Sequence, residues 1–82
     1  MKQVKHTKSS ANKQWGAACV RLLGQLAGRE QSSYLTDGDR GFIWDMRIKA
    51  QAFGSGFVAS EAQVRRLQDS VNRLKEKGDI EA

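Results

Sequence analysis

The chain of 82 residues contains no proline, one cysteine and one histidine, and these shortages exclude several kinds of structure. Because Cys19 is the sole cysteine, no internal disulfide can form, and together with His6 it falls short of the ligand set of a structural zinc site. No apolar run approaches the ~20 residues that cross a bilayer. A domain this small therefore depends on good helix packing or on association with a partner.

The N-terminal stretch MKQVKHTKSSANKQWG is basic, but no apolar segment follows it, so it does not resemble a secretory signal. A free cysteine and the absence of an export signal predict a cytoplasmic location. Residues 1–10 are too polar to bury the surface that ordering requires, and we expect them to form a flexible basic arm. Residues 11–82 are then expected to form a single α-helical domain.

The first two helices are predicted from apolar side chains that recur at helical spacing. The first begins near residues 10–12 and ends at Gly28, since glycine tolerates the left-handed backbone conformation. Its apolar stripe consists of Trp15, Ala18, Cys19, Leu22, Leu23 and Leu26. The second begins after the N-cap Thr36 and ends at the GSG stretch of residues 54–56. Its apolar face consists of Phe42, Ile43, Met46, Ala50 and Phe53.

The third helix is predicted to begin at Ser60, whose side chain forms a capping box with Gln63, and to end at Gly78. Its apolar positions are Val64, Leu67, Val71 and Leu74. This stripe is either the core face of a three-helix domain or, as a short a/d repeat, an oligomer seam in a possible homodimer. No segment alternates convincingly between polar and apolar residues, so no sheet is expected beyond a short extended piece at residues 56–59. We therefore predict an all-α fold, a small compact three-helix domain with a flexible basic N-terminal arm.

The net charge of +5 is concentrated in the first third of the chain. Residues 1–30 carry six cationic side chains and one carboxylate, whereas residues 31–59 carry three of each and residues 60–82 carry five of each. Cationic side chains on an arm and an adjoining helix can neutralise phosphates without a fixed geometry, although a basic tail can also serve solubility alone. The residues predicted to contact nucleic acid are Lys2, Lys5, Lys8, Lys13, Arg21 and Arg29.

The polar face of the third helix offers secondary candidates for nucleic-acid contacts. These are Arg65, Arg66 and Arg73, which are residues of the kind that contact phosphates and base edges. Carboxylates on the same helix balance them, so the face is also typical of a merely solvated helix surface. The link between the second and third helices is longer than the tight turn of a helix-turn-helix motif, so the sequence does not favour a standard motif of that kind.

The aromatic side chains raise a second kind of interface. In so small a domain most of Trp15, Tyr34, Trp44, Phe53 and Phe57 are expected to lie in the core. Trp44 falls off the apolar stripe of its helix, however, and tryptophan and arginine dominate the energetics of protein interfaces. The predicted partner-binding residues are therefore Arg40, Trp44 and Arg47, with core packing as the alternative for Trp44.

No pattern in the sequence predicts catalysis, a cofactor or a metal. His6 lies in the predicted arm, and Cys19 lies on an apolar stripe, where a buried thiol behaves as a small apolar group. The spacing of Asp37, Asp39 and Asp45 matches no calcium-binding loop, and acids in the first turn of a helix are favoured by its dipole alone. We therefore predict that the chain is not an enzyme and holds neither a metal nor a cofactor.

Two stretches, LTDGDRGFIWDM and FVASEAQVRRLQD, resemble a pattern in small proteins encoded by phages and prophages. In that pattern a Leu-Thr start leads to an acidic residue and a Phe-Ile pair, and a later Ser-x-x-Gln opens a helix with spaced leucines. The resemblance runs from Leu35 to Asp69. It implies a small helical accessory protein of a phage or mobile element that acts in the cytoplasm of a bacterial host. Such proteins commonly bind nucleic acid, or bind and inhibit a host machine that handles it.

We therefore expect a small non-enzymatic accessory protein that binds nucleic acid through its basic N-terminal region. The alternative is a protein-binding inhibitor or adaptor of a host nuclease, polymerase or CRISPR-type defence complex. A third hypothesis is a helical oligomerisation module. Charge does not separate the first two, because a nucleic-acid binder and a protein that blocks a nucleic-acid channel both need a positive surface.

Overall fold

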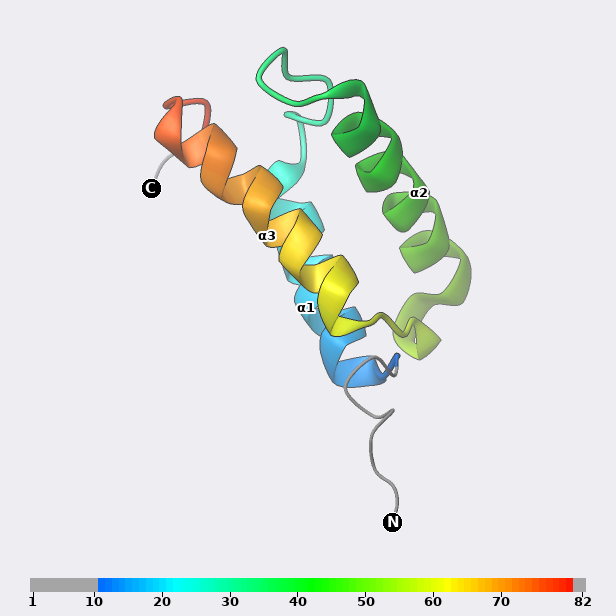
Figure 1. Cartoon of the computed structure of the whole chain (residues 1–82). Helices are drawn as coiled ribbons and strands as arrows, with labels where there is room; N and C mark the ends of the chain where they lie inside the picture. The colour runs from blue at the N-terminus through cyan, green and yellow to red at the C-terminus, as the bar shows by residue number, and fades with distance from the viewer. Residues whose placement is uncertain (1–10, 81–82) are drawn as a thin grey trace.

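The computed structural model describes residues 11–80 and has three α-helices (Figure 1). They are α1 (Lys13–Leu26), α2 (Asp37–Phe53) and α3 (Glu61–Glu76), with one 3₁₀ turn, η2 (Gly54–Gly56), directly after α2. The predicted all-α, three-helix architecture is confirmed. The predicted flexible arm at residues 1–10 lies outside the described residues.

Each helix begins at a side-chain cap, which satisfies backbone N–H groups that have no partner within the helix. The Asn12 side chain caps α1. Thr36 and Asp39 form a reciprocal capping box at the start of α2, and Ser60 and Gln63 form one at the start of α3. The predicted starts of all three helices are therefore confirmed by the hydrogen bonds that hold them.

The helices end where glycine follows, as predicted. The backbone φ angles of Gly28, Gly54 and Gly78 are 81°, 55° and 77°, in the left-handed region that other residues seldom adopt. The chain therefore leaves each helix in a new direction, which lets three short helices fold back on one another.

The core lies mainly between α1 and α3, and Figure 1 shows this pair crossing closely with α2 set to one side. The buried apolar side chains are Cys19, Leu22, Leu23, Leu26, Leu35, Ile43, Met46, Phe57, Ala59, Leu67, Val71 and Leu74. From α2, only Ile43 and Met46 are buried, because leucines of α1 and α3 fill most of the interior. The cysteine is fully buried, as predicted.

The apolar stripe of α3 is used inside the monomer. Leu67, Val71 and Leu74 have no exposed surface, and Val64 packs at the edge of the same core. These four residues are therefore not available as the oligomer seam that the sequence suggested, because α1 covers them within the same chain. Their alternative interpretation, as the core face of a three-helix domain, is confirmed.

An isolated antiparallel bridge joins the start of α1 to the segment before α3. The amide of Asn12 donates to the carbonyl of Ala59 at 2.9 Å, and the amide of Ala59 donates to the carbonyl of Asn12 at 3.1 Å. Next to this bridge Gly16 is buried against backbone atoms of Phe57 and Val58. Among the described residues, the short extended piece predicted near residues 56–59 therefore pairs through this one bridge.

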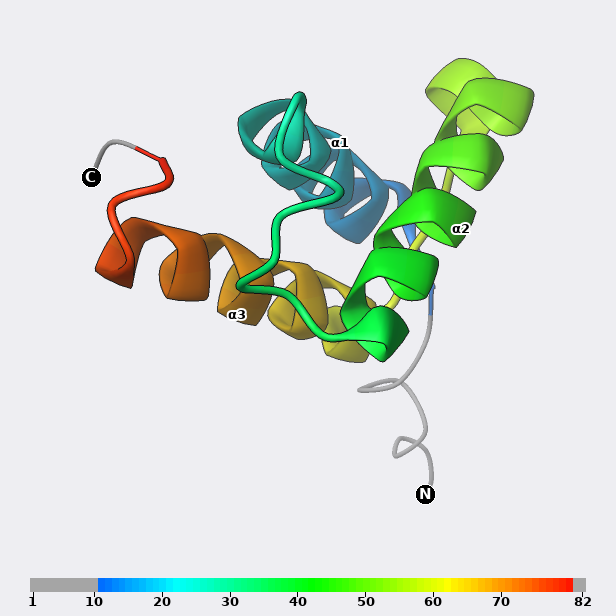
Figure 2. The same ribbon diagram turned by 90° about the horizontal axis from the view of Figure 1, so that it is seen from above.

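The first turns of α2 lie beside α3, after the link from α1 has crossed towards that helix (Figure 2). The guanidinium of Arg66 lies 4.5 Å from the ring centre of Phe42, and its Nη2 atom lies 3.9 Å from a carboxylate oxygen of Asp39. A cation over an aromatic face is worth roughly 0.5–1 kcal/mol at an exposed site. One arginine of α3 therefore holds the N-terminal part of α2 in place.

The expectation that most of the large aromatic side chains are in the core is wrong. Phe57 is buried and Trp15 is partly buried, but Tyr34, Trp44 and Phe53 are 45%, 59% and 64% exposed. The reason is that the leucines of α1 and α3 already fill the interior, so little room remains for rings. Phe53 lies at the last residue of α2 and is left without cover there.

Candidate nucleic-acid interface

The exposed face of α1 carries positive charge and no negative charge. Its outward residues are Lys13, Gln14, Ala17, Val20, Arg21, Gly24 and Gln25. They face outward because the stripe with Cys19 and Leu22 turns the opposite side of the helix into the core. No aspartate or glutamate occurs anywhere in α1. The face therefore presents cations, amides and small side chains together.

Cations on the other elements are largely neutralised by neighbouring carboxylates. The ion pairs are Arg29–Asp79, Arg40–Asp37, Arg47–Glu30, Lys49–Asp45, Arg65–Glu61 and Arg66–Asp39. Within residues 11–80, Lys13 and Arg21 form no salt bridge. The positive charge of α1 is thus available to an external anion, whereas most other cations already have a partner.

The predicted contact Arg29 lies away from this face, in the link after α1. Its Nε atom donates to the backbone carbonyl of Asp79 at 2.7 Å, and its side chain is 50% exposed. This bond ties the end of α1 to the chain that follows α3. Lys2, Lys5 and Lys8 lie outside the described residues, directly before the Asn12 cap in sequence.

The secondary candidates on α3 are placed on its outer face, as predicted, but two of them have internal partners. Arg65 pairs with Glu61 at 2.9 Å, while Arg66 lies over α2 as described above. Arg73 forms no ion pair among residues 11–80, and it lines a small charged notch that also includes Asp69. The face carries charges of both signs, so it lacks the single-sign character of α1.

Of the predicted partner-binding residues, Arg40 acts as an internal clamp. Its Nη1 atom donates to the carbonyls of Ser32 and Leu35 at 2.9 and 2.7 Å, and its Nη2 atom pairs with Asp37. A guanidinium has several donors in a fixed plane, which suits it to binding carbonyl groups in a loop. Arg40 therefore fixes the link before α2.

Arg47 is also engaged within the chain, because it pairs with Glu30 and donates to the carbonyl of Leu23 at 3.4 Å. Trp44, one turn earlier, is 59% exposed and projects from the outer side of α2. Ile48 lies four residues after Trp44, on the same side of α2 as Trp44, and is 47% exposed. Trp44 is thus the accessible member of the predicted partner-binding trio.

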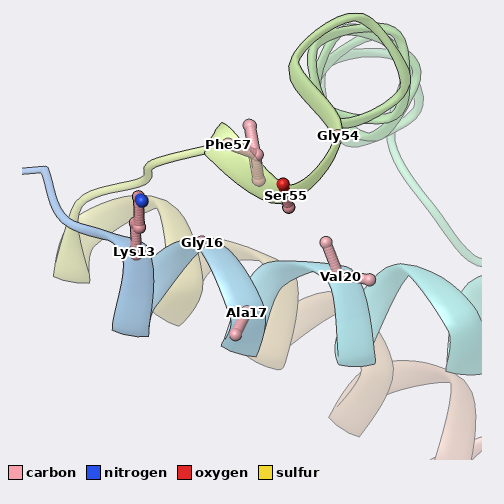
Figure 3. A pocket seen from close by; sticks show the side chains of 7 residues that line it. All are labelled: Lys13, Gly16, Ala17, Val20, Gly54, Ser55 and Phe57. Atoms are coloured by element: carbon pink, nitrogen blue, oxygen red, sulfur yellow. The ribbon is translucent and has the colours of Figure 1, made fainter.

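A hollow lies beside the basic face of α1, where the chain leaves α2 (Figure 3). Its volume is about 300 Å³. Lys13, Ala17 and Val20 line it from α1, and Ser55 and Phe57 close the other side. Sequence reasoning missed this site. The signal was present in the small residues of α1 that share a helical face with Lys13.

The buried thiol gives no sign of reactivity. Burial raises the pKa of the Cys19 thiol to about 11, so the group is neutral at physiological pH, and a neutral thiol is a poor nucleophile. In the described part of the chain, no three His, Cys, Asp or Glu side chains gather closely enough to hold a metal ion. Over the same residues, no helix has the length and apolar character needed to cross a membrane.

No model of a known protein family matches the chain, and neither a curated protein nor a solved structure shows a significant similarity to it.

Proposed function

We propose that this chain binds nucleic acid through the exposed face of α1, together with Lys2, Lys5 and Lys8 before it. The observation that carries this proposal is the absence of any carboxylate from a helix face that holds Lys13 and Arg21. The contacts are electrostatic and depend little on base sequence. The accessory, non-enzymatic role, the cytoplasmic location and the phage context expected from the sequence belong to the same proposal.

The geometry of α1 suits a phosphate backbone. The interval from Lys13 to Arg21 spans ~12 Å at the rise of an α-helix, and one DNA strand advances ~3.4 Å per nucleotide. The two cations therefore reach phosphates a few nucleotides apart. Ala17 lies between them and lets the helix approach the backbone closely, while Gln14 and Gln25 supply amide donors for phosphate oxygens.

The test is a salt series with duplex DNA, single-stranded DNA and RNA, in which two charge-matched double variants are compared. K13A/R21A removes two cations that form no salt bridge within the described part of the chain, and K49A/R65A removes two cations that are paired with Asp45 and Glu61. Each lost phosphate contact reduces the magnitude of the negative slope of log K against log salt by ~0.9 for duplex DNA. We expect a decrease of ~2 for K13A/R21A and a much smaller change for K49A/R65A. Equal effects of the two pairs, or binding that ignores salt, would refute the proposal.

A second candidate function is a protein-binding inhibitor or adaptor of a host nucleic-acid-processing machine. The observation that favours it is Trp44, which is more than half exposed, although burial of a tryptophan ring removes a large apolar area from water. An exposed tryptophan is a common anchor of protein interfaces. The experiment is a comparison of W44A with the native chain for inhibition of a DNase, an RNA polymerase and a CRISPR-type complex. Inhibition by the native chain that W44A loses, without loss of fold, supports this function, and no inhibition by the native chain refutes it.

A further inference from the structure

A groove runs along α1 between this helix and the C-terminal half of α2. It consists of two adjoining hollows, of about 300 and 410 Å³, which share Val20 of α1 and Gly54 at the end of α2. One hollow begins at Lys13, and the other reaches Gly24 and Arg47. The groove therefore follows most of the length of α1, ~16 Å between its first and last lining residues.

The lining is shallow and mostly apolar, and many of its residues are small. Gly16, Ala17 and Gly24 line it from α1, and Ala50 lines it from α2. Val20 stands in the middle and is 49% exposed, although removal of a valine side chain from water is favourable. Small residues let the backbone of a bound segment approach closely, and the exposed apolar side chain of Val20 at the centre would be buried beneath that segment.

We propose that this groove docks an amphipathic helix of a partner protein whose apolar stripe is flanked by carboxylates. A groove of ~16 Å accommodates about three turns of helix, and a helix laid into an apolar groove is a recurring mode of peptide recognition. The stripe of the bound helix covers Val20 and the small residues on either side of it. This docking role goes beyond nucleic-acid binding; because both would use Lys13 and Ala17, the partner helix and a nucleic acid are expected to compete for this face of α1.

The acidic character of the partner follows from the charges around the groove. Among residues 11–80, no carboxylate lines either hollow and Lys13 at one end forms no salt bridge, while Arg21 lies one turn beyond Ala17 on the same helix. Arg47 at the other end already has Glu30 as a partner. Attraction is therefore strongest at the Lys13 end, where acidic residues of the partner helix are expected to lie.

The same charges argue against the other possible occupants. Residues 1–10 carry Lys2, Lys5 and Lys8, no carboxylate and no apolar stripe, so they match neither the charge nor the apolar lining. A second copy of the chain has a net charge of +5 and brings the same positive field to the groove. A nucleic acid offers phosphates but no apolar stripe to cover Val20.

Trp44 extends the proposed docking surface beyond the groove. Arg47 and Gln51 line the second hollow, whereas Trp44, three and seven residues before them in α2, lines neither hollow and lies by helical spacing between the groove side and the outer side of the helix. We expect a bound helix that extends past the second hollow to reach the exposed ring of Trp44.

The experiment is a titration of the ¹⁵N-labelled full chain with two designed helical peptides of about four turns. Both carry the same leucine and alanine stripe; one has glutamates on its flanks and the other has lysines. We expect the glutamate peptide to shift the amide signals of Val20, Gly24 and Ala50, and the lysine peptide to leave them in place. Absence of shifts, equal shifts by both peptides, or shifts confined to the outer face of α3 would overturn the proposal. So would shifts of the groove amides that follow protein concentration alone, because they would indicate a second copy.

A variant that fills the groove separates docking from general attraction. A Cβ at Gly24 would meet no atom within 4 Å, so G24L fits the fold while its side chain occupies the groove. The matched control is Q25L, which adds a leucine to the adjacent exposed position outside the groove. We expect G24L to lower the affinity of the chain for the glutamate peptide by at least about tenfold, and Q25L to leave this affinity unchanged. Thermal unfolding of both variants confirms that they are folded, and unchanged affinity for G24L would contradict the docking site.

Discussion

The substitution G16A tests the closest approach in the fold. A Cβ at this position would lie 2.2 Å from the carbonyl oxygen of Phe57, 2.9 Å from its carbonyl carbon and 3.2 Å from the Cα atom of Val58. All three are backbone atoms, which cannot rotate away as the end of a side chain can. The extended segment before α3 therefore has to move away from α1, and the bridge between Asn12 and Ala59 is strained with it.

The expected free energy change combines opposing contributions. Overpacking of a close contact costs about 1–3 kcal/mol, and each weakened backbone hydrogen bond of the bridge adds ~1 kcal/mol. Replacement of glycine by alanine within a helix returns about 1 kcal/mol through helix propensity. The bridge has two such hydrogen bonds, so the net destabilisation of G16A is about 2–4 kcal/mol. G24A is the matched control, because its Cβ meets no atom within 4 Å, and it is expected to stabilise the chain by about 0.5–1 kcal/mol.

Urea and thermal unfolding of the two variants, followed by circular dichroism, measure this difference. A change of 1 kcal/mol corresponds to roughly 4–8 °C in Tm for a domain of this size. We expect G16A to melt below the native chain and G24A to melt at or above it, with ~10 °C or more between the variants. If G16A were as stable as G24A, the close packing of α1 on the Phe57 segment would be refuted.

Four further outcomes are expected. L67A should lower the free energy of unfolding by about 2–5 kcal/mol, because it leaves a cavity in the monomer core, while sedimentation shows no change of oligomeric state. S60A should cost ~1 kcal/mol in urea unfolding, because it removes the cap of α3. W44A should change unfolding by less than about 0.5 kcal/mol, because the ring is mostly exposed. Burial raises the pKa of the Cys19 thiol from 9.0 to about 11, so as pH rises the unfolded chain loses the thiol proton before the folded chain does. The free energy of unfolding of the native chain should therefore decrease between pH 9 and pH 11, and that of C19A should decrease much less.

The helices and their limits were predictable from the sequence because local chemistry determines them. Capping side chains such as Ser60 bind amides three residues away, and glycines such as Gly28 adopt the left-handed conformation without help from the rest of the fold. The apolar stripes follow from helical period alone. The candidate cations Lys13 and Arg21 were likewise identified from the charge distribution, because lysine and arginine side chains nearly always lie at the protein surface.

The tertiary features were not predictable from the same patterns. The sequence does not reveal that Arg40 and Arg47 bind carbonyls and carboxylates from the link after α1, because these partners are brought together only by packing. Nor does the pattern indicate that Phe53 extends past the part of α2 that the core covers. The groove also depends on the angle between α1 and α2, which is set by side-chain volumes in the core rather than by any local motif.

The unequal packing of the helices has a consequence for how the protein opens. Because α2 buries only Ile43 and Met46 while α1 and α3 share the main core, α2 is the element whose detachment requires the least free energy. Its amide hydrogens are then exchanged with solvent in partial openings that leave the α1–α3 pair closed. A segment bound between α1 and α2 joins the weakly held element to the strongly held one. If the proposed helix docks in the groove, its binding is expected to couple two units of different stability into one cooperative unit.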